Sequence, residues 1–139
     1  MGRSYHFECS KCGYRAIVSG RADRGLNFAV QTIVCRDCRK LFDAVTRLRI
    51  ADDTGLKLGN LGLRNHEFAR VPRHTAAPGF DEALNRLPYQ GVKRYRWLKF
   101  KLRCPVSPIH NIQPWNEPDK CPRCGLHLER NALPYRIWD

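Results

Sequence analysis

The chain has 139 residues, of which 25 are lysine or arginine and 13 are aspartate or glutamate, giving a formal net charge of +12. This excess favours a polyanion or an acidic surface as the partner. No apolar run approaches the roughly 18 residues of a membrane span, and the start of the chain lacks the apolar stretch of a secretion signal. We therefore expect a cytoplasmic protein with no membrane partner, in which seven cysteines favour metal binding over disulfides.

Charge and cysteines divide the chain into three parts. Residues 1–50 carry ten basic and four acidic side chains, residues 51–90 carry five of each, and residues 91–139 again carry ten and four. All seven cysteines lie in the two basic parts. Because a stretch of about 50 residues seldom folds without a metal, disulfides or a partner, we expect metal-stabilised modules at 1–50 and 92–139. Residues 51–91 would be a linker or an elaborated loop.

Short strands are predicted through the first part. Residues 5–8 and 14–19 flank the first cysteine pair, and "GRADRG" at 20–25 is typical of a turn. "LNFAVQTIV" at 26–34 alternates with a period of two, which predicts a strand. "KLFDAVTRLRI" at 40–50 predicts another strand, although the spacing of Leu41, Val45 and Leu48 also fits a helix.

The middle segment has little strand character. "TGLKLGNLGLRN" and "VPRHTAAPGF" have loop composition, whereas "FDEALNRL" at 80–87 predicts a short helix with acidic residues at its positive end. Strand character returns in "VKRYRWLKFKLRC", just before the last three cysteines. The predicted fold class is small, metal-stabilised and mainly β, with two β-hairpin modules joined by a loop-rich segment that holds one short helix.

The first predicted metal site consists of Cys9, Cys12, Cys35 and Cys38. Each pair has the spacing C-x-x-C, a turn that we call a knuckle, which lets two thiolates converge on one ion. The 22 residues between the knuckles suffice for two strands and a turn. Four thiolates in a closed tetrahedron suit zinc.

The second predicted site is less regular. Cys121 and Cys124 form a knuckle and Cys104 is a third ligand, but the position of a regular fourth cysteine is occupied by Ser107. His110 is the nearest good ligand, and His127 is the alternative. A site completed by Ser107 or by water is the remaining interpretation. Two zinc ions per chain are expected in all.

These residues resemble known metal modules. Both cysteine-rich parts look like zinc ribbons, which are β-hairpin modules built on two knuckles. The order also resembles small prokaryotic proteins with an N-terminal ribbon and a C-terminal "CPxCG" ribbon, in which a Pro-Trp pair, here Pro114 and Trp115, separates the C-terminal knuckles. The resemblance implies fold and metal but no activity. "CSKCGY" is also similar to the first knuckle of rubredoxins, so an iron electron carrier is a remote alternative.

The segment before Cys104 suggests a nucleic-acid surface. In a strand, one face would combine cations with two aromatic rings, as single-stranded nucleic acid requires. The alternative without a ligand is that the rings belong to the core and the lysines are solvent-exposed charges that protect an edge strand from unwanted pairing. The predicted nucleic-acid-binding residues are Lys93, Tyr95, Trp97, Lys99, Lys101 and Arg103.

The leading functional hypothesis is a zinc-binding, non-enzymatic protein that binds RNA or single-stranded DNA within a larger assembly. The alternative is an adaptor that docks on a protein partner through an apolar patch near residues 56–63 or Trp115. No catalytic motif and no small-molecule substrate is evident, so we expect no enzyme activity. His66, Glu67 and His74 could be assembled into a hydrolytic site, but polar loop residues are the better interpretation.

Overall fold

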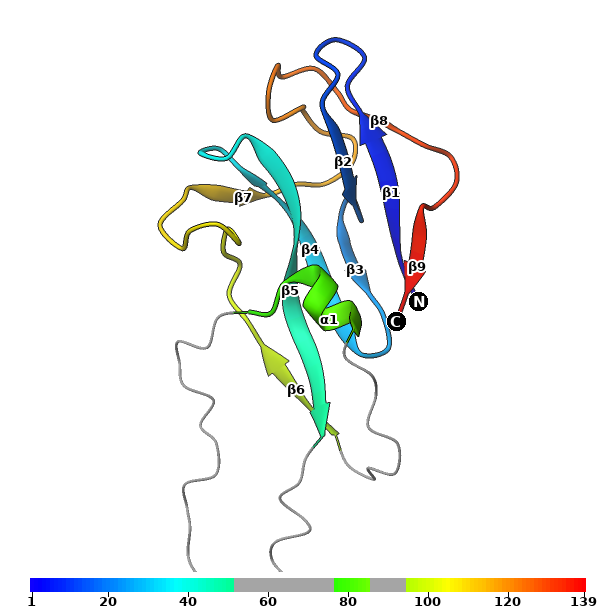
Figure 1. Ribbon diagram of the computed structural model, residues 1–139, viewed down its shortest axis with the longest axis vertical. Coiled ribbons are helices and arrows are strands. Elements are labelled where there is room, and N and C mark those ends of the chain that lie inside the picture. The colour runs from blue at the N-terminus through cyan, green and yellow to red at the C-terminus, as the bar shows by residue number, and fades with distance from the viewer. Residues whose placement is uncertain (52–76, 86–94) are drawn as a thin grey trace, which may run out of the picture.

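The fold was analysed in a computed structural model, which describes residues 1–51, 77–85 and 95–139. The predicted mainly β fold is confirmed for this part of the chain, and one short helix accompanies the strands (Figure 1). The elements are β1 (Gly2–Glu8), β2 (Arg15–Val18), β3 (Ala22–Arg24), β4 (Phe28–Cys35), β5 (Lys40–Ala51), α1 (Phe80–Asn85), β6 (Tyr95–Lys99), β7 (Ile112–Pro114), β8 (Glu129–Arg130) and β9 (Arg136–Trp138).

The first sheet is organised around β1. Strand β2 pairs with one edge of β1, and the two C-terminal strands β8 and β9 pair with its other edge, all antiparallel. Phe7 pairs with Arg130 of β8, and Gly2 pairs with Trp138 of β9. The two ends of the chain therefore lie together (Figure 1). Gly2 is required there, because a Cβ atom would lie 2.4 Å from the Trp138 ring.

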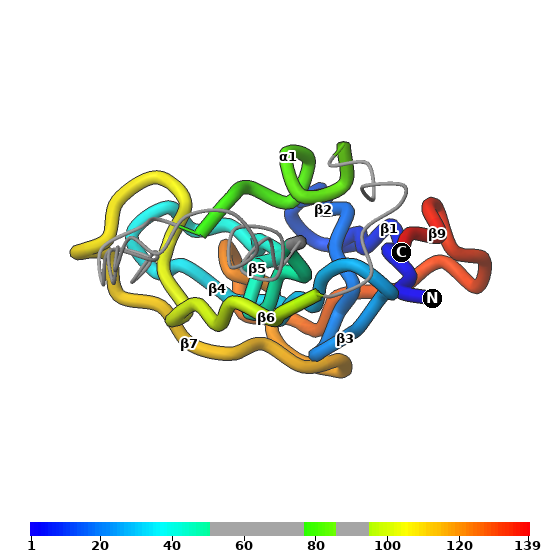
Figure 2. The backbone as a smooth tube through the Cα atoms, turned by 90° about the horizontal axis from the view of Figure 1, so that it is seen from below, coloured from blue at the N-terminus to red at the C-terminus, as the bar shows by residue number. Residues whose placement is uncertain are grey.

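The second sheet has the order β3-β4-β5-β6. Strand β7 pairs with the same edge of β4 as β3 does, further along the strand. Strand β4 lies at its centre and is buried on both faces, which explains its nearly continuous apolar sequence. The predicted turn at 20–25 instead contains β3, whose residues Ala22–Arg24 pair with β4. Helix α1 lies on one side of the β4–β6 region (Figure 2).

A β-bulge explains the ambiguous pattern in residues 40–50. Val30 pairs with Val45 while Ala29 pairs with Arg47, so Thr46 is an extra residue on β5. An extra residue shifts the inward and outward alternation by one position. Val45 and Leu48 therefore both enter the core although they are three residues apart. This spacing resembles a helix, but the segment is a strand.

Two apolar clusters hold the sheets together. One surrounds Phe7 and Trp115, whose rings meet edge to face at 5.4 Å, and it includes Cys9 and Cys121. The other surrounds Phe28 and contains Val45, Leu48 and Ala83 of α1, with Trp138 stacked on Phe28 at 4.4 Å. Each cluster combines residues from 1–50 with residues from 92–139. The strands expected to form two successive modules therefore pack together. Among the described residues no helix is long and apolar enough to cross a membrane.

A carboxylate joins the two sheets. Asp43 of β5 accepts hydrogen bonds from the Ser19 amide at 2.8 Å, from the Ser19 hydroxyl at 3.1 Å and from the Thr32 hydroxyl at 2.6 Å. The Gly20 amide donates to the Thr32 hydroxyl oxygen in turn. Removal from water raises the pKa of Asp43 to about 6, even though these hydrogen bonds favour the ionised form.

This raised pKa predicts a pH dependence of stability. The folded chain holds a proton on Asp43 between roughly pH 4 and pH 6 that the unfolded chain has released, so the contribution is complete below this window and lost as the pH rises through it. Lowering the pH from about 7.5 to about 5.5 should stabilise the native chain by about 1 kcal/mol relative to Asp43→Asn. Urea unfolding of both proteins at saturating metal measures this difference, and identical pH profiles would exclude it.

Candidate metal centres

The first cluster lies where the β1–β2 turn meets the last cysteine pair. Its ligand atoms are the thiol sulfurs of Cys9, Cys12, Cys121 and Cys124, which all lie within 4.8 Å of one another. The Sγ atoms of Cys9 and Cys124 are 3.3 Å apart, and those of Cys12 and Cys121 are 3.7 Å apart. Four thiolates around zinc at about 2.3 Å have tetrahedral edges of about 3.8 Å, so this cluster fits such an ion.

The second cluster lies at the tip of the β4–β5 hairpin. Cys35, Cys38, Cys104 and His110 bring three thiols and one imidazole within 4.8 Å. The Nδ1 atom of His110 is 3.6 Å from the sulfur of Cys35 and 3.3 Å from that of Cys38. The sulfurs of Cys38 and Cys104 are 3.7 Å apart. The chemistry of this set fits a tetrahedral ion with Cys₃His ligation.

The structure brings together all eight residues proposed as ligands, but it pairs the knuckles differently from the sequence prediction. Cys9 and Cys12 were expected to share an ion with Cys35 and Cys38, and Cys104 and His110 with Cys121 and Cys124. Each cluster instead joins one N-terminal knuckle to C-terminal ligands.

Strand pairing is the physical reason for this exchange. β1 pairs with β8, which places the knuckle at 121–124 beside the one at 9–12. β4 pairs with β7, and Cys35 pairs with Ile112, which places His110 beside the β4–β5 turn. The Asn111 amide also donates to Asp37 inside that turn at 2.7 Å.

All three knuckles share one backbone feature. The residue after the second cysteine has a positive φ of 71° at Gly13, 77° at Gly125 and 52° at Arg39. Glycine adopts this conformation without strain, whereas arginine does so at a cost. The middle knuckle has Arg39 where the other two have glycine. Its geometry is nevertheless maintained, and the Cys38 amide donates to the Cys35 sulfur at 3.3 Å.

The acid–base properties of the thiols favour a bound cation. A hydrogen bond from the Cys12 backbone is the main cause that lowers the pKa of Cys9 to about 6. Burial and the neighbouring thiols raise the pKa of Cys38 to about 12. Several adjacent thiols cannot all ionise without a compensating charge. A divalent cation supplies that charge and holds the ligands as thiolates.

The two clusters are linked by direct contacts between their turns. The Arg39 guanidinium donates to the carbonyl oxygen of Arg123, inside the knuckle at 121–124, at 2.7 Å. The Arg123 guanidinium lies 5.0 Å from the centre of the Tyr14 ring. The Tyr14 hydroxyl accepts a hydrogen bond from the Leu41 amide at 2.8 Å. Part of the basic surface near the knuckles therefore has a structural use.

Neither alternative fourth ligand is needed, because each cluster already contains four protein ligands. His127 is exposed and belongs to an isolated bridge with Lys120. Ser107 lies in the loop between Cys104 and His110, and its backbone forms a hydrogen bond with the Cys104 thiol. Its carbonyl oxygen accepts a hydrogen bond from the His110 amide at 3.3 Å. His66, Glu67 and His74 lie outside the described residues.

The predicted nucleic-acid residues are only partly assembled on one surface. Tyr95, Trp97 and Lys99 lie in β6, whereas Lys101 and Arg103 follow the end of that strand. These last two line a separate hollow beside Cys104 and α1. Lys93 lies outside the described residues.

Two arginines that were not predicted as binding residues accompany the rings of β6. The Arg49 guanidinium lies 3.8 Å from the centre of the Tyr95 ring, and that of Arg24 lies 5.0 Å from the Trp97 ring. They come from β5 and β3, so only the strand register places them there.

The fold and the two clusters define a small, mainly β protein with one Cys₄ and one Cys₃His candidate metal centre. The chain matches no family model, no curated protein and no solved structure.

Proposed function

We propose that the protein binds two zinc ions and uses the resulting β scaffold to bind single-stranded nucleic acid, without catalysing a reaction. Zinc suits both ligand sets, because it prefers four-coordinate sites of thiolate and imidazole. Both clusters use all four positions for protein ligands, as structural zinc sites do, so no open position is left for a substrate. Metal binding and folding should then be one equilibrium, and a strong chelator should unfold the chain.

The observation that carries the nucleic-acid proposal is a row of cations across the second sheet. Arg24 of β3 pairs with Ala29, Ala29 pairs with Arg47 of β5, and Arg47 pairs with Lys99 of β6. Paired residues of antiparallel strands share a face, so these three cations lie on one side of the sheet. Arg49 and Trp97 form the next pair on the same face.

This row is costly without an anionic ligand. Arg47 and Lys99 lie directly opposite each other, and like charges in that arrangement are destabilising. Among the described residues the ion pairs join the Met1 amine to Asp139, Arg15 to Glu8, Arg130 to Glu117 and Arg136 to Asp81. None of these described pairs neutralises the row. Phosphate groups would do so, while the neighbouring rings of Tyr95 and Trp97 supply surfaces for bases.

Fluorescence anisotropy with labelled twelve-residue oligo(U) and oligo(dT) tests this function on the zinc-loaded protein. We expect both to bind, with an affinity that falls as salt rises because phosphate contacts release counterions. Trp97→Ala should weaken binding by about 1–3 kcal/mol, the usual contribution of one stacked base. Tyr135→Ala removes an exposed ring just before β9. It is the matched control and should leave the affinity unchanged. Absence of salt-dependent binding to either strand would contradict the proposal.

One observation favours an adaptor as the second candidate function. The loop between Cys104 and His110 exposes Val106 by 68% and Ile109 by 89%, so the second metal centre would present two apolar side chains to solvent. Trp115, which we expected in such a patch, is instead only 1% exposed and belongs to the core. The other expected patch, at 56–63, lies outside the described residues. A partner whose capture depends on Ile109 would support this candidate.

A further inference from the structure

The same face of the second sheet contains a hollow with a composition suited to a nucleobase. It has a volume of about 800 Å³ and lies between the β3–β4 turn and the strands β5 and β6. Ligand sites commonly measure about 300–1,000 Å³. Its lining includes the ion pair of Met1 and Asp139 together with Arg24, Arg49, Tyr95 and Trp97.

The hollow lies on the side of the sheet that α1 does not cover. Ala83 of α1 packs in the cluster that contains Leu48, and Leu48 pairs with Leu98 of β6. Arg49 follows Leu48 by one position and Trp97 precedes Leu98 by one position, so both side chains point to the opposite face of the sheet. The helix therefore lies on the opposite face of β5 and β6 from Arg49 and Trp97.

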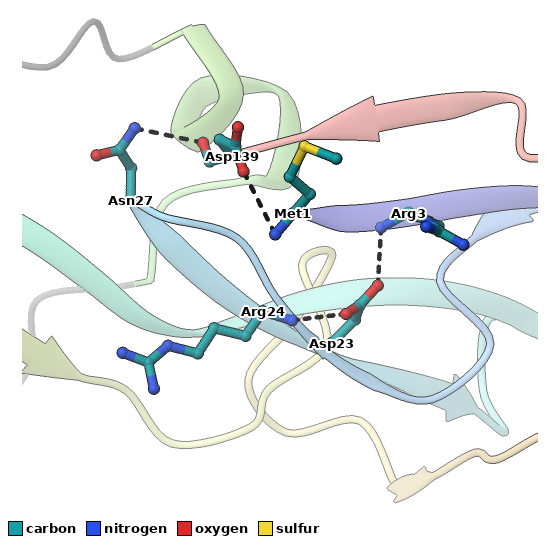
Figure 3. Close-up of polar contacts among 6 residues, drawn as sticks. All are labelled: Met1, Arg3, Asp23, Arg24, Asn27 and Asp139. Carbon is teal, nitrogen blue, oxygen red and sulfur yellow. Dashed lines mark hydrogen bonds and ion pairs between the residues drawn. The ribbon is translucent and has the colours of Figure 1, made fainter.

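The carboxylates near the hollow already have partners. Asp23 accepts hydrogen bonds from the backbone amides of Arg3 and Arg24, both at 2.8 Å. Asp139 lies 3.5 Å from the Met1 amine, and its carbonyl oxygen accepts a hydrogen bond from Asn27. Figure 3 shows that the Arg24 guanidinium extends away from both aspartates. Its planar group faces the Trp97 ring instead.

We propose that this hollow is the base-binding subsite of the nucleic-acid surface, where one base of a single strand stacks on the Arg24 guanidinium, which itself lies over the Trp97 ring. This inference rests on the proposed nucleic-acid function and adds the position of the base. Bases stack on aromatic rings and on guanidinium planes in single-stranded recognition. Arg49 stays against Tyr95 at the edge of the hollow, and the neighbouring row of Arg47 and Lys99 receives the phosphates.

Single strands fit this arrangement because their bases are free to leave a stack. In a duplex the bases are paired and their faces are covered, so the rings of the hollow would have no base to contact. The described residues that line the subsite are mainly aromatic and cationic and offer stacking surfaces, so binding should tolerate sequence changes. RNA and single-stranded DNA share this chemistry, and the two oligonucleotides of the assay distinguish them.

Substitution of two arginines from the same hairpin tests the subsite in the zinc-loaded full chain. Arg24→Ala should weaken oligo(U) and oligo(dT) binding about tenfold, and Arg24→Lys should weaken it nearly as much, because lysine keeps the charge but not the planar group. Arg21→Ala removes an equal charge from an exposed side chain outside the hollow, so it should change binding about twofold or less. An abasic twelve-mer, with phosphates but no bases, should bind the native chain and Arg24→Lys equally.

Tryptophan fluorescence gives an independent measurement. Trp115 and Trp138 are 1% and 3% exposed, whereas Trp97 lines the hollow, so a stacked base should quench mainly Trp97. The quenching should disappear in Trp97→Phe. Equal effects of Arg24→Ala and Arg21→Ala on a chain that still binds both oligonucleotides would overturn the subsite and leave the proposed function intact. No binding by the native chain would reject both.

Discussion

A chain in which Cys12 and Cys124 are both replaced by serine is expected to retain one zinc ion, whereas a chain with Cys12 and Cys38 replaced should retain none. The first pair belongs to a single cluster in the structure, so the Cys₃His cluster keeps all its ligands. The second pair takes one ligand from each cluster. Zinc content by mass spectrometry, on protein purified without added metal, distinguishes the two variants.

The sequence-based pairing makes the opposite prediction. There Cys12 and Cys38 share one site, so their joint loss would leave one ion, and the loss of Cys12 and Cys124 would damage both sites. The expected effect is large, because structural zinc contributes about 10–16 kcal/mol of apparent binding free energy in small domains. The Cys35→Ser/Cys104→Ser variant is the matched control and should also retain one ion, since both residues lie in the second cluster.

Cobalt substitution keeps the test informative if a double variant folds poorly. Single replacements remove one ligand at a time, and cobalt bound by four thiolates differs in its absorption spectrum from cobalt bound by three thiolates and an imidazole. Cys121→Ser should alter the four-thiolate signal, whereas His110→Ala should alter the mixed signal. If both replacements changed the same signal, the structural grouping would be wrong.

The identity of the candidate ligands was accessible from the sequence because it depends on local geometry. A C-x-x-C turn directs two thiolates to one point whatever the rest of the fold does. The choice of His110 over His127 also followed from spacing, and the structure groups His110 with three cysteines. The predicted strands likewise cover most of β1, β2, β4 and β5.

The partner of each knuckle was not accessible, because it is a long-range property. Cys9 and Cys124 are separated by 115 residues, and their meeting depends on the pairing of β1 with β8. No local signal in a two-residue strand such as Glu129–Arg130 specifies that partner. The short separation of Cys12 and Cys35 favoured the wrong pairing. In the structure each of these knuckles lies at the tip of its own hairpin, β1–β2 or β4–β5.

Register also explains why the arginines of the proposed subsite were missed. Arg24 belonged to a predicted turn and Arg49 to the end of an uncertain strand. The Thr46 bulge shifts the side chains of β5 so that Arg47 and Arg49 lie on the face of the sheet opposite α1. A single sequence does not reveal a bulge, because the extra residue has no distinctive composition.

The second large effect is expected for Trp115→Ala, which should lower the free energy of unfolding by about 3–5 kcal/mol. Trp115 is 1% exposed, and its ring meets Phe7 edge to face. Its indole N–H donates to the carbonyl oxygen of Lys120 at 3.0 Å, and its backbone amide donates to Thr32 at 2.9 Å. The substitution leaves a cavity between the two sheets, and urea unfolding at saturating zinc measures the loss.

Trp115→Phe distinguishes the loss of stability caused by the cavity from the loss caused by the missing indole hydrogen bond. Phenylalanine keeps a ring against Phe7 but leaves the Lys120 carbonyl oxygen without its donor, so we expect a smaller loss of about 1–2 kcal/mol. Trp97→Ala is the matched control, because this tryptophan lies on the outer face of β6 and its removal creates no internal cavity. Equal losses for Trp97→Ala and Trp115→Ala would contradict the assignment of Trp115 to the core.

The same substitution should act unequally on the two metal centres. Trp115 packs in the cluster that contains Cys9 and Cys121, whereas Cys35, Cys38, Cys104 and His110 lie at the tip of the β4–β5 hairpin. Loss of the ring loosens the support of the Cys₄ centre first. Titration with a chelator should therefore remove the four-thiolate cobalt signal of Trp115→Ala at a lower chelator concentration than in the native chain, while the mixed signal shifts less. Equal shifts of both signals would mean that the ring supports the whole scaffold rather than one centre.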